Sequence, residues 1–595
     1  MTTPARPTAD GRRWRTLAGL LVVWSVAWSV PQDTIVGDTK IDLYLDPWGF
    51  LARSLHVWDP QVTWGGLQNQ AYGYLFPMGP FFGLGSEILP MWVVQRLWWM
   101  ALLTAGFLSM MGLLRVFGIG GAGVRVIASL AYVLAPRVIA TIGGLSSEAH
   151  AQLLAPAILL PLVMIDRGEL GVRRGVELSG LAIVCGGGVN ATATAFAILP
   201  SAVWLLTRRA WGGDSLTWGW GVAVLGATSW WLVPLVLLGR YSPPFLDWIE
   251  NAQTVTARIT LFDAFRGTTH WLGHLVTSGG VWWPAGFETV SSPVLILATA
   301  AVSALGLAGF LVRSLPHRRF LVILLALGVL VIALPHQGPF SSPVSGQVQS
   351  LLDGPLTPLR NVHKADLLIR LPLVVGLAHA VVALSRWRPR RQWMPAVAIG
   401  GVALTVVGAA APGFSGAIAP RGSFTEVAQQ WQEVGRWLDD RGDGRALIVP
   451  ASSFGEYSWG RPMDEPLRSL TSAPFAVRDA VPLPPAGTIR LLDEIESRLQ
   501  TGDALGGATS TLRSAGVRYL VLRNDLAVDQ AGQPPVALSR SALVNTPDVE
   551  FVKGFGKTVR DGSGERVFPV EVYAVVGDVA TNLEVWDAEG VVGAS

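Results

Sequence analysis

The sequence predicts a polytopic α-helical membrane protein with a water-soluble α/β domain in its C-terminal part. Of the 595 residues, 50% are hydrophobic and 15% are charged, whereas soluble domains carry roughly 25% charged residues. The charge is also unevenly divided. Residues 1–412 hold 28 Lys/Arg and 18 Asp/Glu. The much shorter segment 413–595 holds 17 Lys/Arg and 24 Asp/Glu. We therefore expect a lipid-embedded domain over 1–412 and a soluble domain over 413–595.

Eleven mostly apolar runs predict about 11 transmembrane helices, because a span needs about 20 mostly apolar residues. The first run ends at Trp28-Ser29-Val30-Pro31 without a small-residue cleavage site, which indicates a retained anchor rather than a signal peptide. The runs near 152–165, 176–189 and 193–207 are short and contain or border prolines, which favours tilted, kinked or re-entrant helices. The other runs lie near 15–31, 91–113, 122–142, 216–238, 292–312, 320–334, 367–385 and 393–412.

The distribution of basic residues predicts the orientation, because cytoplasmic segments are enriched in Lys and Arg. With the N-terminus in the cytoplasm, 18 Lys/Arg lie on that side and seven lie in the opposite loops. Acidic residues show the reverse distribution, with five on the cytoplasmic side and thirteen in the opposite loops. Eleven spans then place residues 413–595 outside the membrane, together with the long segments 32–90, 239–291 and 335–366.

Helices and strands alternate in the predicted outer domain, which is typical of an α/β fold. Ser423-Phe424-Thr425-Glu426 matches a capping box and predicts a helix to about Asp440. Further helices are predicted over 488–499 and 508–514. Apolar runs predict strands over 445–450, 517–522, 549–552 and 570–575.

The segment after the first apolar run is unusually acidic. It holds four carboxylates and one ammonium group within fourteen residues, namely Asp33, Asp38, Lys40, Asp42 and Asp46. Repulsion between carboxylates this close together moves their pKa values apart. One of them can then act as a proton acceptor near the working pH. The alternative is a solvated acidic loop. Whether these carboxylates hold a divalent cation is left open, and no spacing among the histidines demands a transition-metal site.

Further charged groups are predicted on the same outer face. Arg360, His363 and Lys364 precede the tenth apolar run, where cations can hold a phosphate at headgroup level or anchor the chain by snorkelling. The 239–291 segment mixes charges with aromatic rings, which suits either sugar binding or interfacial packing. Glu148 is the single acid of a short outer loop.

The chain combines a carboxylate just after the first predicted span, a long first outer loop, ten or more predicted spans and a trailing soluble domain. Its most distinctive stretches are 38–43, 68–80, 94–99, 359–364, 454–462 and 515–521. In these features and stretches it resembles the membrane-embedded GT-C glycosyltransferases, and more narrowly the α-(1→3)-arabinofuranosyltransferases of the AftD type from actinobacterial cell-wall synthesis. Members of that type are often longer, with carbohydrate-binding modules downstream.

The resemblance implies inverting α-(1→3) transfer of D-arabinofuranose from decaprenyl-phosphoryl arabinose to an arabinan acceptor of arabinogalactan or lipoarabinomannan. The active site and soluble domain would face the periplasm of a bacterial plasma membrane. Membrane lipid is a further expected partner and nucleic acid is not. Asp38 is implied as the catalytic base, with Glu250 and Glu148 as further acidic candidates. The candidates for binding the donor phosphate are Lys40, Arg360, His363, Lys364, Arg240 and Arg258.

Two other functions are compatible with this architecture. A polyprenyl-phosphomannose-dependent mannosyltransferase remains an alternative, because only the family stretches favour arabinose. A polyprenyl-glycan flippase is less favoured, since transporters usually show repeated halves and polar sites near the bilayer midplane. In this sequence the charged groups concentrate at the outer rim and no repeat is evident.

Overall fold

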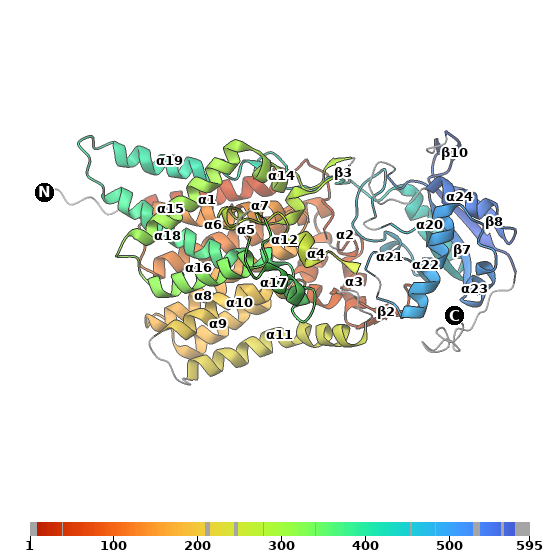
Figure 1. Ribbon diagram of the computed structural model, residues 1–595, viewed down its shortest axis with the longest axis horizontal. Helices are drawn as coiled ribbons and strands as arrows, with labels where there is room; N and C mark the ends of the chain where they lie inside the picture. Colours follow the sequence, from red (N-terminus) through yellow and green to blue (C-terminus); the bar gives the residue numbers. More distant parts are fainter. Residues whose placement is uncertain are drawn as a thin grey trace.

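The computed structural model describes residues 9–38, 40–68, 70–208, 215–242, 248–277, 279–338, 341–452, 455–481, 483–527, 536–560 and 564–577. Thr39, Asn69 and Phe454, which belong to the stretches quoted above, lie outside the described residues. The molecule is elongated, with a bundle of helices at one end and a sheet with its own helices at the other (Figure 1).

The predicted apolar runs all fall on helices. Five of these helices, α5, α8, α11, α15 and α18, are long and apolar enough to cross a membrane, the last counted together with the turn before it. The exact number of spans stays a prediction. The helices are α1 (Ala9–Ala27), α5 (Met91–Val116), α6 (Ala122–Val133), α7 (Pro136–Thr141), α8 (Ser146–Asp166), α9 (Val172–Cys185), α10 (Ala191–Thr207), α11 (Ser215–Tyr241), α15 (Pro293–Leu311), α16 (Arg318–Ala333), α18 (Asp366–Arg386) and α19 (Met394–Gly408).

Two of the predicted runs differ from the observed helices in a way that shapes the site. The run 122–142 is broken between α6 and α7, because Pro136 lacks an N–H group and disfavours helical geometry at the residue before it. The run 152–165 is longer than predicted, since α8 already begins at Ser146 and continues through Pro156 and Pro161. Polar residues of α7 and of the first turn of α8 therefore lie inside the fold.

Helices α8 and α18 form the centre of the bundle. In the most apolar part of each helix, 78% of the residues of α8 and 89% of those of α18 are buried. In α11 the corresponding share is 22%. Helix α18 packs against α15, α16 and α6. Its contact with α15 is close because both helices carry glycine there: a Cβ atom on Gly309 would collide with the carbonyl oxygen of Gly376.

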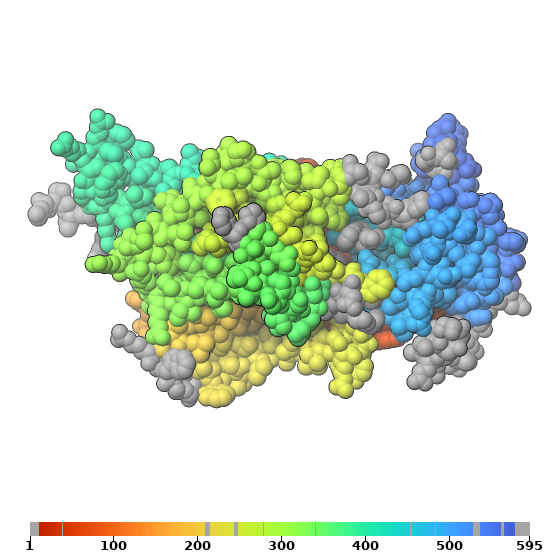
Figure 2. All heavy atoms as spheres, viewed as in Figure 1, coloured from red at the N-terminus to blue at the C-terminus, as the bar shows by residue number. Residues whose placement is uncertain are grey.

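Short helices and hairpins lie between the helices of the bundle and beside the sheet (Figure 1). The segment 32–90 contains α2 (Asp42–Leu45), α3 (Pro47–Ser54), β1 (Trp58–Asp59), β2 (Gly66–Leu67), η1 (Ala71–Leu75) and α4 (Met78–Ser86). Later segments contain α12 (Ala252–Thr256), α13 (Leu261–Arg266), η3 (Trp271–His274), β3 (Val276–Thr277), β4 (Gly280–Val281), α14 (Pro284–Ser291), α17 (Ser345–Leu352), η4 (Thr357–Leu359), η5 (Val362–Ala365) and η6 (Ala411–Gly413). Helix α17 lies on the face of the bundle shown in Figure 2.

The predicted strands assemble into one mixed sheet with the order β6-β5-β7-β11-β8. Strand β5 is parallel to β6 and β7, whereas β11 is antiparallel to β7 and β8. The strands are β5 (Arg445–Val449), β6 (Phe475–Val477), β7 (Val517–Arg523), β8 (Val549–Phe555) and β11 (Val570–Val575), and a small hairpin pairs β9 (Val559–Arg560) with β10 (Arg566–Val567). The accompanying helices are α20 (Gln429–Arg441), α21 (Leu467–Leu470), α22 (Ala486–Thr501), α23 (Ala508–Ser514) and α24 (Val536–Val544).

The predicted capping box at Ser423–Glu426 is wrong. Helix α20 begins only at Gln429, because the backbone of Phe424 pairs instead with Ile35 in the segment 32–90. The two N–H to carbonyl hydrogen bonds measure 2.7 and 3.0 Å. A second bridge joins Val62 to Phe475 of β6, a strand that the sequence did not predict. Local pattern could not reveal either pairing, since both join residues several hundred positions apart.

Candidate active site

Asp38 lies buried at the N-terminal end of α8. Its Oδ2 atom accepts hydrogen bonds from the backbone N–H of Ser146, at 3.2 Å, and from the Ser146 hydroxyl, at 2.5 Å. The side chain is 2% exposed. The N-terminus of a helix offers unpaired N–H groups and a favourable field for negative charge. The carboxylate is thereby fixed beside the first turn of α8.

Glu148, two residues after Ser146 on that turn, gathers polar side chains from separate segments of the chain. Its closest partner is Arg137 of α7, whose Nη2 atom lies 2.6 Å from Oε2. The other partners are Lys364 Nζ at 3.2 Å, Asn190 Nδ2 at 3.3 Å, His363 Nε2 at 3.7 Å and His270 Nε2 at 3.8 Å. We call these six residues the Glu148 cluster.

The Glu148 cluster carries more positive than negative charge. Arg137 and Lys364 contribute two cations against the single carboxylate. Burial above all, and then the neighbouring His363 and Arg137, lower the pKa of His270 well below its ordinary value, so that this imidazole is neutral at pH 7. Among the described residues, nothing accepts or donates a hydrogen bond at Arg137 Nη1, His270 Nδ1 or His363 Nδ1. Buried polar atoms normally have partners, so the cluster suits an anionic ligand.

Three residues of the same cluster could in principle bind a metal ion. Glu148, His270 and His363 offer ligand atoms that all lie within 4.8 Å of one another. However, Arg137 and Lys364 already pair with that carboxylate, and a divalent ion there would be repelled by both cations at short range. The donor set therefore fits an anion better than a metal ion. In the part of the chain that the structure describes, the carboxylates after the first helix form no comparable group.

Glu250 and Arg360 lie beside this cluster and connect two outer segments. The Glu250 carboxylate accepts a hydrogen bond from Asn361 Nδ2 at 2.9 Å, and its carbonyl oxygen accepts one from Arg360 Nη1 at 2.5 Å. Arg360 Nε also pairs with Asp353 Oδ1 at 3.1 Å. The buried Arg360 guanidinium is thus engaged with its own surroundings, and this network supports the turn that carries His363 and Lys364.

The three remaining candidates lie elsewhere. Lys40 Nζ pairs with Asp464 Oδ2 at 3.0 Å, between the first outer segment and the C-terminal part. Arg240 is exposed at the end of α11, with its guanidinium 5.7 Å from the ring of Tyr241, and Arg258 is also exposed. The structure therefore brings Asp38, Glu148, His363 and Lys364 together, has Glu250 and Arg360 beside them, and leaves Lys40, Arg240 and Arg258 outside the cluster. The catalytic roles of all these residues remain predictions.

Comparison with known proteins identifies the family. A family described as α-(1→3)-arabinofuranosyltransferase, N-terminal GT-C domain, matches residues 22–594. The chain belongs to this family. The resemblance inferred from the sequence stretches is thereby confirmed, and the helical bundle has the GT-C fold.

Named relatives and solved structures agree with this family. An α-(1→3)-arabinofuranosyltransferase of Mycolicibacterium smegmatis (strain ATCC 700084 / mc(2)155) is 40% identical over 547 residues, covering 89% of this chain and 38% of the relative. The α-(1→3)-arabinofuranosyltransferase of Mycobacterium tuberculosis (strain ATCC 25618 / H37Rv) is 38% identical over 573 residues, covering 92% of this chain and 40% of that relative. A cryo-EM structure of the mycobacterial arabinofuranosyltransferase AftD superposes with a TM-score of 0.80 at 34% identity, covering 97% of this chain and 40% of that one. The chain thus spans about two fifths of the length of these relatives.

Three members of the Glu148 cluster in this GT-C domain were not predicted from the sequence. Arg137 falls inside the apolar run 122–142, which predicts one continuous span. The proline at position 136 is the feature of the sequence that indicates a break there. His270 lies in the mixed charged and aromatic segment 239–291, where nothing in the sequence singles it out from its neighbours. Asn190 begins an Asn-Ala-Thr sequence between two short apolar runs, which gives no indication of a contact with Glu148. Only tertiary structure brings these residues to Glu148.

Proposed function

We propose that this chain is the catalytic GT-C part of a membrane arabinofuranosyltransferase. It transfers D-arabinofuranose from decaprenyl-phosphoryl arabinose to an arabinan acceptor, forming an α-(1→3) branch. The observation that carries the proposal is the buried, net positive Glu148 cluster beside Asp38. Family membership supports the sugar and the linkage, since the named relatives are α-(1→3)-arabinofuranosyltransferases.

The Glu148 cluster matches the charge of such a donor. A sugar linked to a polyprenyl phosphate is a phosphodiester with one negative charge. With neutral imidazoles, the cluster has one net positive charge, from Arg137 and Lys364 less Glu148. Charge-assisted hydrogen bonds from these cations stabilise the phosphate as it becomes the leaving group. Glu148 then acts by holding both cations in place rather than by touching the sugar.

Asp38 is assigned the role of general base. The acceptor hydroxyl oxygen attacks the anomeric carbon, and its proton passes to the Asp38 carboxylate. The bond between the anomeric carbon and the phosphate oxygen breaks at the same time, and its electron pair leaves with decaprenyl phosphate. The nearby carboxylate also stabilises the oxocarbenium character of the transition state. Direct displacement inverts the anomeric centre.

The proposal includes an orientation and a division of the chain. We assign residues 1–412 to the membrane-embedded catalytic domain, with about eleven spans, and residues 413–595 to an outer soluble domain. The site then faces the extracytoplasmic side of the plasma membrane, which the Lys/Arg distribution supports. A donor headgroup is accessible there while its polyprenyl tail stays in lipid. The placement of Lys40, Arg240 and Arg258 favours other roles for them than holding the donor phosphate.

Direct transfer assays test this function. Purified protein is incubated with a short arabinan acceptor and radiolabelled decaprenyl-phosphoryl arabinose, or in parallel with a polyprenyl-phosphoryl mannose. We expect a labelled arabinan product from the arabinose donor alone. A product from the mannose donor instead would support the mannosyltransferase alternative. Movement of the labelled lipid across a vesicle membrane without any product would identify a flippase.

A further inference from the structure

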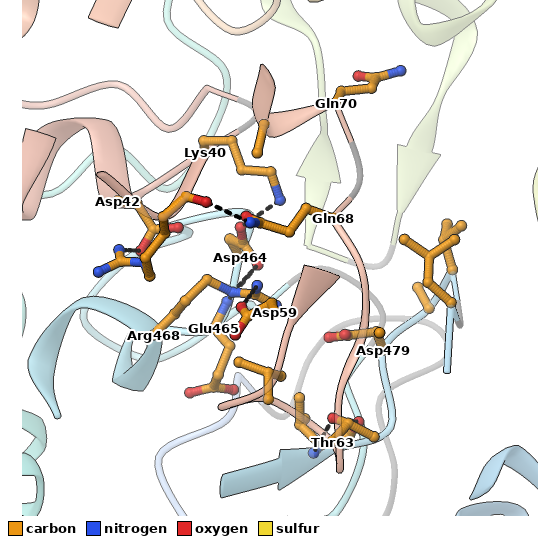
Figure 3. Close-up of a pocket in the computed structure, with 18 of the residues that line it drawn as sticks. Lys40, Asp42, Asp59, Thr63, Gln68, Gln70, Asp464, Glu465, Arg468 and Asp479 are labelled. Atoms are coloured by element: carbon orange, nitrogen blue, oxygen red, sulfur yellow. Dashed lines mark hydrogen bonds and ion pairs between the residues drawn. The ribbon is translucent and has the colours of Figure 1, made fainter. Parts of the chain in front are cut away.

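A second charged site lies between the first outer segment and the C-terminal part. It is a cavity of about 350 Å³. Residues of the first outer segment, among them Lys40 and Asp59, line one side, and Asp464, Arg468 and Asp479 line the other (Figure 3). The backbone bridges from Ile35 to Phe424 and from Val62 to Phe475 join the two walls. The cavity therefore exists only while the two parts of the chain are docked.

The charges in this cavity nearly balance. Five carboxylates and four cationic side chains line it. Lys40 pairs with Asp464 at 3.0 Å, and Arg468 lies 3.6 Å from Asp59 and 4.0 Å from Asp464. A near-neutral wall that is rich in hydrogen-bonding groups is unsuited to a strongly charged ligand. It offers many donors and acceptors to a neutral polyhydroxyl compound.

Among the described residues, Asp479 is the carboxylate of this cavity that has no hydrogen-bonding partner. Its carboxylate points toward the middle of the cavity (Figure 3). In the described part of the chain no group donates a hydrogen bond to it, and it takes part in no ion pair. Burial raises the pKa of Asp479, followed by weaker effects of surrounding charges. A hydroxyl group of a ligand in the cavity can donate a hydrogen bond to this carboxylate, which accepts through both oxygens.

The cavity is close to the proposed base and small. Lys40 follows Asp38 by two residues, so its backbone lies at most about 7 Å from that of Asp38. Small-molecule sites usually measure about 300–1,000 Å³, and 350 Å³ is at the low end of this range. This volume suits one or two sugar residues and excludes a polyprenyl chain.

We propose that this cavity binds the acceptor glycan, holding a furanose residue adjacent to the one that carries the reacting hydroxyl. Asp479 accepts a hydrogen bond from a hydroxyl of that residue, and Arg468 and Lys40 donate to its oxygens. This inference rests on the proposed function, because it takes the acceptor to be an arabinan. Acceptor recognition would then require the C-terminal part, whereas donor recognition would depend on the Glu148 cluster.

Binding to a protein that cannot turn over tests the inference. The parent is the Asp38→Asn variant, and the probe is an α-linked arabinofuranosyl disaccharide, titrated by isothermal calorimetry. We expect Asp479→Asn in this background to weaken binding about tenfold, as for the loss of one hydrogen bond to a charged group. A second variant, Ala480→Phe, fills the cavity with a ring and should weaken binding further. The exposed Glu494→Gln on α22 is the matched control and should bind as the parent does.

The outcomes separate this site from the proposed function. Unchanged disaccharide binding by both cavity variants, or no binding by the parent, would overturn the acceptor site. Calcium binding that depends on Asp479, without sugar binding, would overturn it as well. Thermal unfolding of each variant checks that the protein remains folded. If the protein with Asp38 intact transfers no arabinose but disaccharide binding depends on Asp479, the function fails while the glycan site stands.

With Asp38 intact, steady-state kinetics provide a second readout. Asp479→Asn should raise KM for the acceptor about tenfold and leave KM for the lipid donor unchanged, since the two substrates contact different side chains. An equal rise in both KM values would contradict a dedicated acceptor site.

Discussion

Glu148 illustrates how a buried charge can organise a binding site at the residue scale. Desolvating a cation costs several kcal/mol unless a counter-charge lies close. Glu148 provides this counter-charge for both Arg137 at 2.6 Å and Lys364 at 3.2 Å. One carboxylate cannot neutralise two cations, so the residual charge is available to a phosphate. Removing either cation should therefore affect the donor more than the acceptor.

Replacing Lys364 by Ala is predicted to impair use of the lipid donor. A hydrogen bond to a charged group contributes about 1.5–3 kcal/mol, which corresponds to about a 10- to 100-fold rise in KM for the donor. Initial rates measured against each substrate in turn check this, with KM for the acceptor expected to stay constant. The exposed Lys557→Ala is the matched control. Equal losses for both substrates would instead indicate a structural role for Lys364.

Only part of the site could be predicted from the sequence. Asp38, His363 and Lys364 were identified because they lie in stretches shared with a known family, and Glu148 because it is an isolated acid in an outer loop. Arg137 and His270 could not be found in this way. Arg137 is embedded in an apolar run, and His270 is one of many polar residues of segment 239–291. Their positions beside Glu148 depend on the break before α7 and on the packing of η3.

At the scale of elements, the apolar runs predicted where helices occur but not how closely they pack. Helices α15 and α18 approach each other because Gly306 and Gly309 face Gly376. In a membrane, helices associate through such close backbone contacts, since lipid provides little hydrophobic drive. Helix α18 follows directly on the turn that carries His363 and Lys364, so this packing positions the proposed donor site. The capping-box error has a similar origin, because backbone pairing with a distant segment replaced a local helix signal.

Gly309→Ala is predicted to destabilise the bundle. The added Cβ atom would collide with the backbone of Gly376, and overpacking of this kind typically costs about 1–3 kcal/mol. We expect the Tm of the detergent-solubilised protein to fall by several degrees in a thermal-shift measurement. Gly400→Ala on α19 is the matched control, because a Cβ atom there meets no atom within 4 Å. Equal Tm values for the two variants would show that the α15–α18 contact tolerates a side chain.

At the scale of the whole molecule, the proposed function requires two docked parts of the chain to lie on the extracytoplasmic side of the membrane. These parts are segment 32–90 and the C-terminal part that pairs with it. The backbone of the first outer segment pairs with the C-terminal part at two places, so both must lie on the same side. The change in charge density predicts a domain boundary near residue 412, and this boundary stays a prediction. The docking itself was not predictable, since the pairings join segments several hundred residues apart.

Cysteine labelling in intact cells is predicted to place the first outer segment outside. The chain has a single cysteine, Cys185, which is first replaced by Ser. His56→Cys, at an exposed position after α3, should then react with a membrane-impermeant maleimide added to whole cells. Arg173→Cys, exposed at the start of α9, should react only after permeabilisation. The reverse pattern would contradict the orientation and the delivery of the donor from the outer leaflet.

The assignment of Asp38 as the base is tested most directly by the rate of arabinofuranosyl transfer from decaprenyl-phosphoryl arabinose to a short arabinan. Asp38→Asn keeps the shape of the side chain but removes its basicity, so we predict a loss of about 10²–10⁴-fold in kcat with a normal Tm. Asp33→Asn, which changes an exposed carboxylate of the same segment, should transfer at the wild-type rate. Near-normal turnover by the Asp38→Asn protein would contradict the mechanism.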